Sequence, residues 1–235
     1  MNIKQNLSEL INEINKQAGL SGRDTEEIRL VAVSKTRSLA EIREAINCGV
    51  SILGENKVQE AFPKYEEIGN IVEWHLIGHL QTNKVKKAVE MSDLIHSVDG
   101  KKLIDEINKC AKNLGKVQNV LAQVNVSGEE TKFGLNIENI FSFFDEICKD
   151  KRLTNVRVKG LMTMAPFTDN TVVVRSCFKK TRELFLELRS RHANHPLIDM
   201  RELSMGMTND FKIAIEEGAT LLRIGAAIFG EREYL

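Results

Sequence analysis

Lys35 stands at the end of an apolar run, in the stretch RLVAVSKTRS that spans residues 29–38. Four apolar residues, 30–33, precede Ser34 and the lysine, which is the pattern of a buried strand that reaches its end. A lysine amine that is desolvated or lies near other cations loses its proton and attacks carbonyl groups. The run by itself fits equally a core strand that only reaches water at Lys35, so its meaning depends on the other strand ends.

Two later segments, LSMGMTND (203–210) and RIGAAIFG (223–230), carry residue types suited to binding an anion. Phosphate sites in α/β proteins use hydroxyl donors, backbone N–H groups at glycines and polar residues that cap a short helix. The candidates for these roles are Ser204, Gly206, Thr208 or Asn209, Gly225 and Ala226. The same glycines also suit tight turns and close packing.

Arg223 interrupts the apolar run TLLRIGAAIF between Leu222 and Ile224. A guanidinium is rarely buried without a partner, so a structural reason for its position is expected. Side chains along a strand alternate between two faces, which places Arg223 and Gly225 on the same face. The sequence therefore predicts a cation beside the proposed anion site.

A lysine at one strand end and an anion site at two others suggest a phosphorylated ligand that carries an aldehyde. Pyridoxal 5'-phosphate (PLP) fits this description, with Lys35 at its aldehyde and Arg223 near its ring. A class I aldolase would also combine a lysine with a phosphate site. The spacing of these residues does not separate the two possibilities.

His75 and His79 are the strongest candidates for a metal site, because they lie four residues apart. That spacing aligns two ligands only on a helix, whereas EWHLIGHL has the pattern of a strand that runs into a loop. No metal site is therefore predicted. His75 is expected in the core or behind the site, and His79, past the strand end, is a candidate contact to the ligand.

Eight apolar runs alternate with amphipathic, helix-like segments along the 235 residues. Runs rich in Val, Ile and Leu without a clean inside-outside period predict a parallel sheet covered by helices. Three of the helix-like segments, 38–49, 99–116 and 209–219, are expected to close at Gly49, Gly115 and Gly218. The predicted strands are 29–35, 51–55, 73–78, 94–99, 117–126, 156–165, 202–207 and 220–230.

Eight such units predict one α/β domain over residues 1–235, a single (β/α)8 TIM barrel with an extra N-terminal helix. An open doubly wound sheet is the alternative, but no G-x-G-x-x-G motif follows any predicted strand. Active sites of such barrels lie at the carboxyl ends of the strands. Lys35 and the two anion-binding segments all lie at such ends.

Charge and cysteine usage indicate a cytoplasmic protein with a small-molecule partner. Lys plus Arg and Asp plus Glu are each 33, so no overall field favours nucleic acid or an anionic membrane. The N-terminus has no continuous apolar core typical of a signal peptide, and no later run is long enough to span a membrane. The four cysteines are widely spaced, as expected for free thiols in a reducing compartment.

Six blocks of sequence closely resemble the YggS/PROSC family of pyridoxal phosphate homeostasis proteins. They occur in the right order along nearly the whole chain: VAVSKT, GENKVQEA, WHLIGHLQTNK, VNVSGEETKFG, GLMTMAP and LSMGMTNDFKIAIEEGATLLRIGAAIFGER. The resemblance implies a single-domain barrel similar to the N-terminal domain of bacterial alanine racemase. It also implies that PLP is the cofactor.

Carried over by motif, the resemblance gives each candidate residue a role toward PLP. Lys35 would hold the cofactor as a covalent internal aldimine, and Arg223 would face the pyridine nitrogen. The phosphate would be bound by Ser204, Gly206, Gly225 and Ala226. Asn56 and Met162 would line the ring pocket, with His79 and Lys132 as possible secondary contacts.

The same residues argue against efficient catalysis. An arginine at the ring nitrogen keeps its own proton, so the ring stays a weak electron sink. Racemisation needs a second acid or base, which alanine racemases take from a tyrosine on an added domain, and here the tyrosines are Tyr65 and Tyr234. We therefore expect a monomeric PLP carrier that buffers the cofactor for apo PLP enzymes. A weak amino-acid racemase is the alternative.

Overall fold

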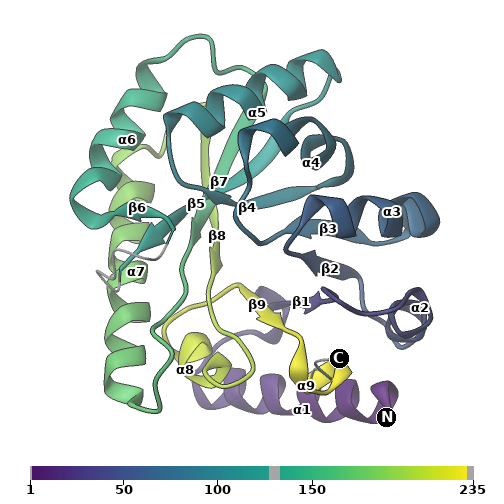
Figure 1. The fold of residues 1–235 in the computed structure, drawn as a ribbon. Helices are drawn as coiled ribbons and strands as arrows, with labels where there is room; N and C mark the ends of the chain where they lie inside the picture. Colours follow the sequence, from purple (N-terminus) through teal and green to yellow (C-terminus); the bar gives the residue numbers. More distant parts are fainter. Residues whose placement is uncertain (1, 127–132, 232–235) are drawn as a thin grey trace.

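Eight parallel strands close into a barrel in the computed structural model, which describes residues 2–126 and 133–231 (Figure 1). They are β1 (Arg29–Val33), β2 (Ile52–Glu55), β3 (Glu73–Leu76), β4 (Leu94–Val98), β5 (Gln118–Asn125), β7 (Val156–Met162), β8 (Ile198–Ser204) and β9 (Leu221–Ile224). Each pairs with the next, and β9 pairs back with β1. A short strand β6 (Leu135–Asn136) pairs with β5 alone. The predicted (β/α)8 barrel is confirmed, and the open sheet is wrong.

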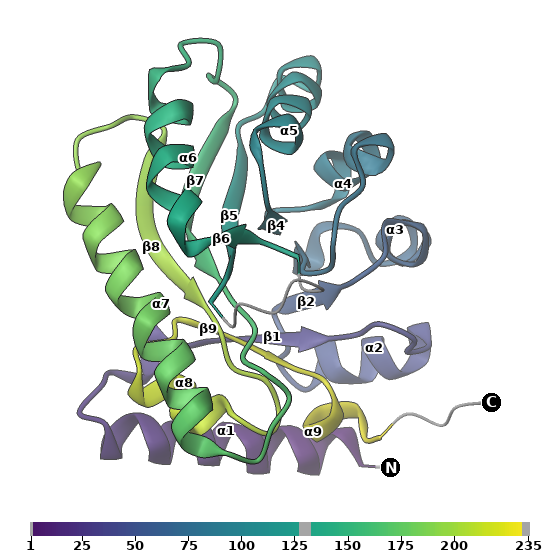
Figure 2. The same ribbon diagram turned by 60° about the vertical axis from the view of Figure 1, so that its left-hand side comes forward.

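One helix follows each barrel strand, and Figures 1 and 2 show these helices around the outside of the strands. The extra N-terminal helix α1 (Ile3–Leu20) packs against the last two helices, as both views show. The others are α2 (Leu39–Asn47), α3 (Val58–Ile68), α4 (Val85–Met91), α5 (Lys101–Asn113), α6 (Ile137–Lys149), α7 (Thr171–Arg191), α8 (Phe211–Glu216) and α9 (Ala226–Phe229).

Local sequence signals set several helix ends. At α2, the Ser38 side chain accepts from the Glu41 backbone while the Glu41 carboxylate accepts from Ser38, which is a capping box. Gly49, Gly115 and Gly218 follow helices with φ values of +102°, +65° and +92°, a region that glycine adopts without strain. The three predicted glycine ends are confirmed.

The last two strands differ from their predicted ranges. The predicted strand 202–207 begins earlier, as β8 at Ile198, and the predicted strand 220–230 ends at Ile224 because the chain turns into α9 from Gly225. Asp210, and not Thr208 or Asn209, occupies the N-cap position of α8, and its side chain makes no capping hydrogen bond to the helix. The carboxylate of Asp210 accepts from the Met207 backbone at 2.5 Å, which holds 207–210 in a turn before the helix.

Two apolar layers hold the barrel together. The larger one lies between the strands and the helices and includes the buried face of α1. The smaller one fills the barrel interior with one residue each from six strands: Val31, Ile52, Leu94, Leu121, Met162 and Leu221. Burial of apolar surface on both sides of the sheet explains why the strands read as continuous apolar runs.

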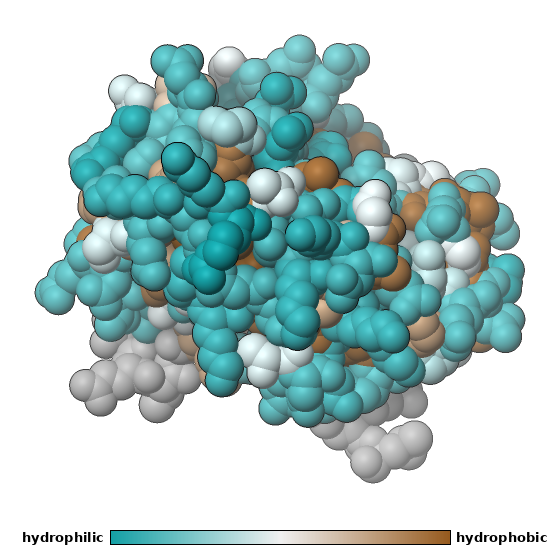
Figure 3. All heavy atoms as spheres, turned by 90° about the horizontal axis from the view of Figure 1, so that it is seen from above, coloured by the Kyte–Doolittle hydropathy of each residue, from teal (hydrophilic) through white to brown (hydrophobic). Residues whose placement is uncertain are grey.

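The surface seen from above in Figure 3 is covered mostly by hydrophilic residues, and hydrophobic residues show there only as small separate patches. In the described part of the chain, no helix combines the length and the apolar character needed to cross a bilayer.

Leu10 on α1 tests the contribution of the extra helix. Its side chain is 5% exposed, whereas the neighbouring Ile11 is 41% exposed. We expect Leu10→Ala to lower the free energy of unfolding by about 2–5 kcal/mol, because it leaves a cavity under α1. Ile11→Ala is the matched control and should change it by less than about 1 kcal/mol. Urea unfolding measures both, and equal effects would contradict the role of α1 as a core helix.

Candidate functional site

A cavity of about 740 Å³ lies at the carboxyl ends of the barrel strands. Strands β1, β2, β3, β5, β7, β8 and β9, or the loops directly after them, all contribute to its wall. The predicted site residues Lys35, Asn56, His79, Arg223, Gly225 and Ala226 line it, as do the cap candidates Thr208 and Asn209. The barrel therefore brings the lysine, the arginine and the small residues of the last loop to one cavity.

The backbone on both sides of Lys35 is held by a buried polar cluster. Lys64 on α3 donates to the Ser34 carbonyl at 2.8 Å, and the Ser34 hydroxyl donates to Glu55 Oε1 at 2.6 Å. On the other side, Thr36 has a φ of +66°, and its N–H donates to Glu60 Oε1. A β-branched residue in this region is strained, so the contact to Glu60 is needed to hold it.

The Lys64 ammonium joins the two halves of this cluster, with 2.8 Å to Glu55 and 2.9 Å to Glu60. Burial raises the pKa of Glu55, and Lys64 and Ser34 offset part of that rise. Burial also disfavours the charged form of Glu60, but hydrogen bonds from Lys64 and Thr36 bring its pKa below the usual value. The position of Lys35 thus depends on a buried lysine with two carboxylates.

Lys64→Met tests this cluster. Removing the ammonium leaves the Glu55 carboxylate, whose side chain is fully buried, without its countercharge. We expect the free energy of unfolding at neutral pH to fall by about 3–5 kcal/mol, as for other broken buried pairs. In the variant the pKa of Glu55 rises further above its unfolded value, so the native state binds the proton more tightly and the deficit shrinks as the pH is lowered.

Urea unfolding at neutral and mildly acidic pH measures this effect. Lys180→Met is the control, because Lys180 is an exposed lysine on α7, and it should change stability by less than about 0.5 kcal/mol. Glu55→Gln added to Lys64→Met should recover part of the loss, since the uncompensated charge is then gone. If the stability loss of Lys64→Met grew as the pH is lowered, it would contradict the conclusion that the buried Glu55 carboxylate needs Lys64 as its countercharge.

The ends of β2 and β3 approach each other closely beside the cavity. A Cβ atom on Gly78 would lie 2.3 Å from the Asn56 carbonyl oxygen, so only glycine fits there. His79 follows, with its ring stacked on Phe133 at a centroid distance of 3.9 Å and its Nδ1 3.4 Å from Asp99 Oδ2. Burial raises the pKa of Asp99, and the nearby His79 ring opposes that rise.

Arg223 is buried at the inner wall of the cavity, with 5% of its surface exposed. Its Nη1 donates to Ser204 Oγ at 2.6 Å, and its Nη2 donates to the Thr163 carbonyl at 2.8 Å. Burial lowers the pKa of Arg223 to about 10, and Asp210 on the cavity wall acts in the opposite direction. The guanidinium therefore stays charged at neutral pH.

Ser204 and Gly206 do not line the cavity, which differs from the predicted anion site. The Ser204 side chain is fully buried, and its oxygen contacts Arg223 and His96. Gly206 has a φ of +92°, and a Cβ atom there would lie 2.6 Å from Ala214 Cβ, so this glycine serves packing against α8. The wall from this segment comes instead from the next four residues, 207–210.

Gly225 and Ala226, like Thr208 and Asn209, belong to the predicted anion site and line the cavity. A Cβ atom on Gly225 would lie 3.1 Å from the Val33 carbonyl oxygen, so the last loop packs tightly against β1. At the start of α9, the N–H groups of Ile228 and Phe229 donate to the Gly225 carbonyl, so those of Ala226 and Ala227 have no partner within the helix.

Met162, another predicted site residue, does not line the cavity. Met162 is 1% exposed and packs in the barrel interior, because its side chain points inward from the last residue of β7. From β7 and the loop after it, Met164 lines the cavity. Lys132 lies outside the described residues.

The two histidines considered as metal ligands lie in different environments. His75 is a residue of β3 that bonds to His96 in the barrel interior, and His79 lies on the cavity wall. Across residues 2–126 and 133–231, no group of three or more His, Cys, Asp or Glu side chains is arranged to hold a metal ion.

The profile of the alanine racemase N-terminal domain matches residues 5–233 of this sequence. The chain belongs to this family. Curated members of similar length carry the name pyridoxal phosphate homeostasis protein. The protein from Aquifex aeolicus is 46% identical over 235 residues, with both chains fully covered. The one from Escherichia coli K12 is 36% identical over 236 residues, covering 99% of this chain and 97% of its own. The predicted family is confirmed.

Solved structures of this family share the fold. PipY of Synechococcus elongatus, described with PLP bound, is 34% identical with a TM-score of 0.80, covering 92% of this chain and all of its own. An alanine racemase of Clostridium difficile is 14% identical with a TM-score of 0.74, covering 99% of this chain and 57% of its own. The second likeness concerns the barrel alone.

Sequence patterns missed most of the supporting residues of the site. Glu55, Glu60 and Lys64 have no local signature, since their meaning comes from contacts between β2, α3 and the loop after β1. His96 sits in the apolar run of β4 and gives no sign that it contacts Ser204, 108 residues away. Only Gly78, next to a predicted strand end, carried a usable signal.

Proposed function

We propose that this protein binds PLP reversibly in the cavity at the carboxyl ends of its strands and maintains its supply without efficient catalysis. The observation that carries the proposal is that Lys35, Arg223 and the backbone of Gly225 and Ala226 line one cavity. An amine for the aldehyde, a polar partner for the ring nitrogen and backbone donors for the phosphate are three features that suit PLP. The names of the curated relatives and the PLP bound to PipY support it.

The residues present fit the cofactor in chemistry and in space. The aldehyde of PLP forms a covalent imine with a primary amine, and in this proposal the amine is that of Lys35. Its phosphate would accept from the backbone of Gly225 and Ala226, with Thr208 and Asn209 nearby on the cavity wall. Asn56 and His79 would flank the ring from the ends of β2 and β3.

Two features argue against an efficient enzyme. Arg223 can only donate to the ring nitrogen, so the ring does not become the strong electron sink that transamination needs. Tyr65, the tyrosine that the structure describes, packs on Trp74 at 5.9 Å and does not line the cavity. It cannot supply the second acid or base of a racemase.

A weak amino-acid racemase is the competing function. One observation favours it, which is that the imidazole of His79 lies on the same cavity wall as Lys35 and could exchange a proton. Our proposal places the protein as a monomeric cytoplasmic carrier that hands PLP to apo enzymes, and in that role His79 would serve only to hold the cofactor.

Absorption spectroscopy with Lys35→Ala tests the proposal. We expect wild-type protein to take up one equivalent of PLP with a visible imine band, and Lys35→Ala to lose that band because the amine is gone. Lys57→Ala is the matched control, since Lys57 is an exposed lysine next to Asn56 and should keep the band. A wild-type protein that takes up no PLP would contradict the proposal. Enzyme-like racemisation that depends on Lys35 would favour the competing function.

A further inference from the structure

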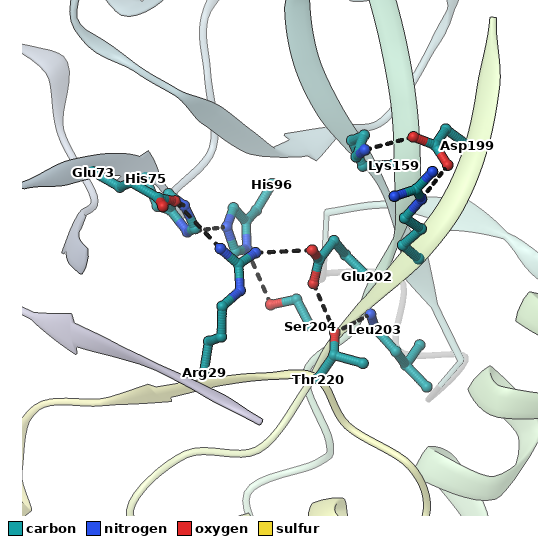
Figure 4. A network of polar contacts seen from close by, with 11 residues as sticks. Arg29, Glu73, His75, His96, Lys159, Asp199, Glu202, Leu203, Ser204 and Thr220 are labelled. Carbon is teal, nitrogen blue, oxygen red and sulfur yellow. Dashed lines mark hydrogen bonds and ion pairs between the residues drawn. The ribbon is translucent and has the colours of Figure 1, made fainter. Parts of the chain in front are cut away.

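A chain of hydrogen bonds crosses the barrel interior from the amino-terminal end of β3 to the cavity. His75 Nε2 lies 3.4 Å from Glu73 Oε2, and His75 Nδ1 lies 3.1 Å from His96 Nε2. His96 Nδ1 lies 3.0 Å from Ser204 Oγ, which in turn contacts Arg223. Figure 4 shows Glu73, His75, His96 and Ser204 pointing toward one another from three different strands.

The two ends of this chain determine the direction of every hydrogen bond in it. The Glu73 carboxylate can only accept and the Arg223 guanidinium can only donate. His75 therefore donates from Nε2 to Glu73 and accepts at Nδ1 from His96 Nε2–H. The Ser204 hydroxyl must then donate to His96 Nδ1, which leaves its oxygen to accept from Arg223.

The environment supports neutral imidazoles in the middle of this chain. Burial lowers the pKa of His96 well below the usual value, with His75 and Arg223 acting in the same direction. Burial likewise lowers the pKa of His75, against the effect of Glu73. The hydrogen bond from His75 lowers the pKa of Glu73 and keeps it an acceptor.

This series of hydrogen bonds gives each of its buried polar side chains a partner and fixes one arrangement of Arg223. Ser204 and His96 are fully buried, so a polar atom that lost its partner there would find no water to replace it. Arg223 commits one N–H to Ser204 and one to Thr163, and the same residue lines the cavity.

We propose that Ser204, His96 and His75 are positioning residues that orient Arg223 toward the bound cofactor. They act through the one-directional chain and touch no ligand themselves. The inference rests on the proposed function, because the group that Arg223 is oriented toward is the ring of PLP. Glu73, with a half-exposed side chain at the far end of the barrel, anchors the arrangement.

His96 variants separate orientation from simple filling of the core. His96→Gln keeps an acceptor for Ser204 and a donor for His75, so it can reproduce the chain, whereas His96→Leu fills space and breaks it. We expect His96→Leu to weaken PLP binding about tenfold or more and to shift the absorption band of bound PLP. His96→Gln should recover most of the affinity and the wild-type band.

Glu202→Gln is the matched control. Glu202 and Glu73 both contact Arg29 at the amino-terminal end of the barrel, at 2.8 Å and 3.4 Å (Figure 4). Unlike Glu73, Glu202 makes no hydrogen bond to His75 and is not part of the hydrogen-bond chain. Its variant should bind PLP as the wild type does. If His96→Leu fails to fold, Ser204→Ala breaks the same link with a smaller change and should produce the same loss and spectral shift.

Two results would overturn the inference. One is a folded His96→Leu or Ser204→Ala protein with wild-type affinity and band. The other is an ¹⁵N spectrum of the histidines, recorded on the cofactor-free wild type, in which His96 carries its proton on Nδ1. The ¹⁵N spectrum tests the hydrogen-bond chain without PLP. A wild type that bound no PLP but showed the expected His96 tautomer would contradict the proposed function, and with it the orientation toward PLP, but not the direction of the hydrogen bonds that hold Arg223.

Discussion

The site depends on the hydrogen bonds that hold the buried guanidinium of Arg223. The guanidinium is a charge buried inside the barrel, and it is tolerated because Ser204 and Thr163 accept its hydrogen bonds. A charge held in this way cannot easily move. The cavity therefore has one fixed cation at its inner wall, around which the residues of the other strand ends are arranged.

Closure of the barrel supplies the second half of the site. Because β9 pairs with β1, the loop after β9 packs against the end of β1, and Gly225 comes within close contact of Val33. Lys35 lies two residues beyond Val33, with its flanking backbone held by Glu55, Glu60 and Lys64. The Lys35 segment and the backbone of Gly225 and Ala226, from opposite ends of the chain, thus line the same cavity.

The sequence predicted the fold and the outline of the site because both depend on local patterns. Apolar runs and glycine-closed helices determine a barrel, and strand ends determine where Lys35, Asn56 and Arg223 lie. Ser204 and Met162 do not line the cavity, because both side chains are buried, and a residue's place near a strand end does not tell the buried interior from the cavity wall. Contacts between distant elements, such as His96 with Ser204, leave no periodic signal in the sequence.

Reduction of the PLP-loaded protein with borohydride, followed by peptide mapping, tests the central claim most directly. Reduction converts an imine into a stable amine, so the lysine that carries the cofactor keeps its mass label through digestion. The account predicts one PLP label per chain, on the peptide that contains Lys35. A label on other lysines with Lys35 unmodified, or no label on a protein that has bound PLP, would contradict it.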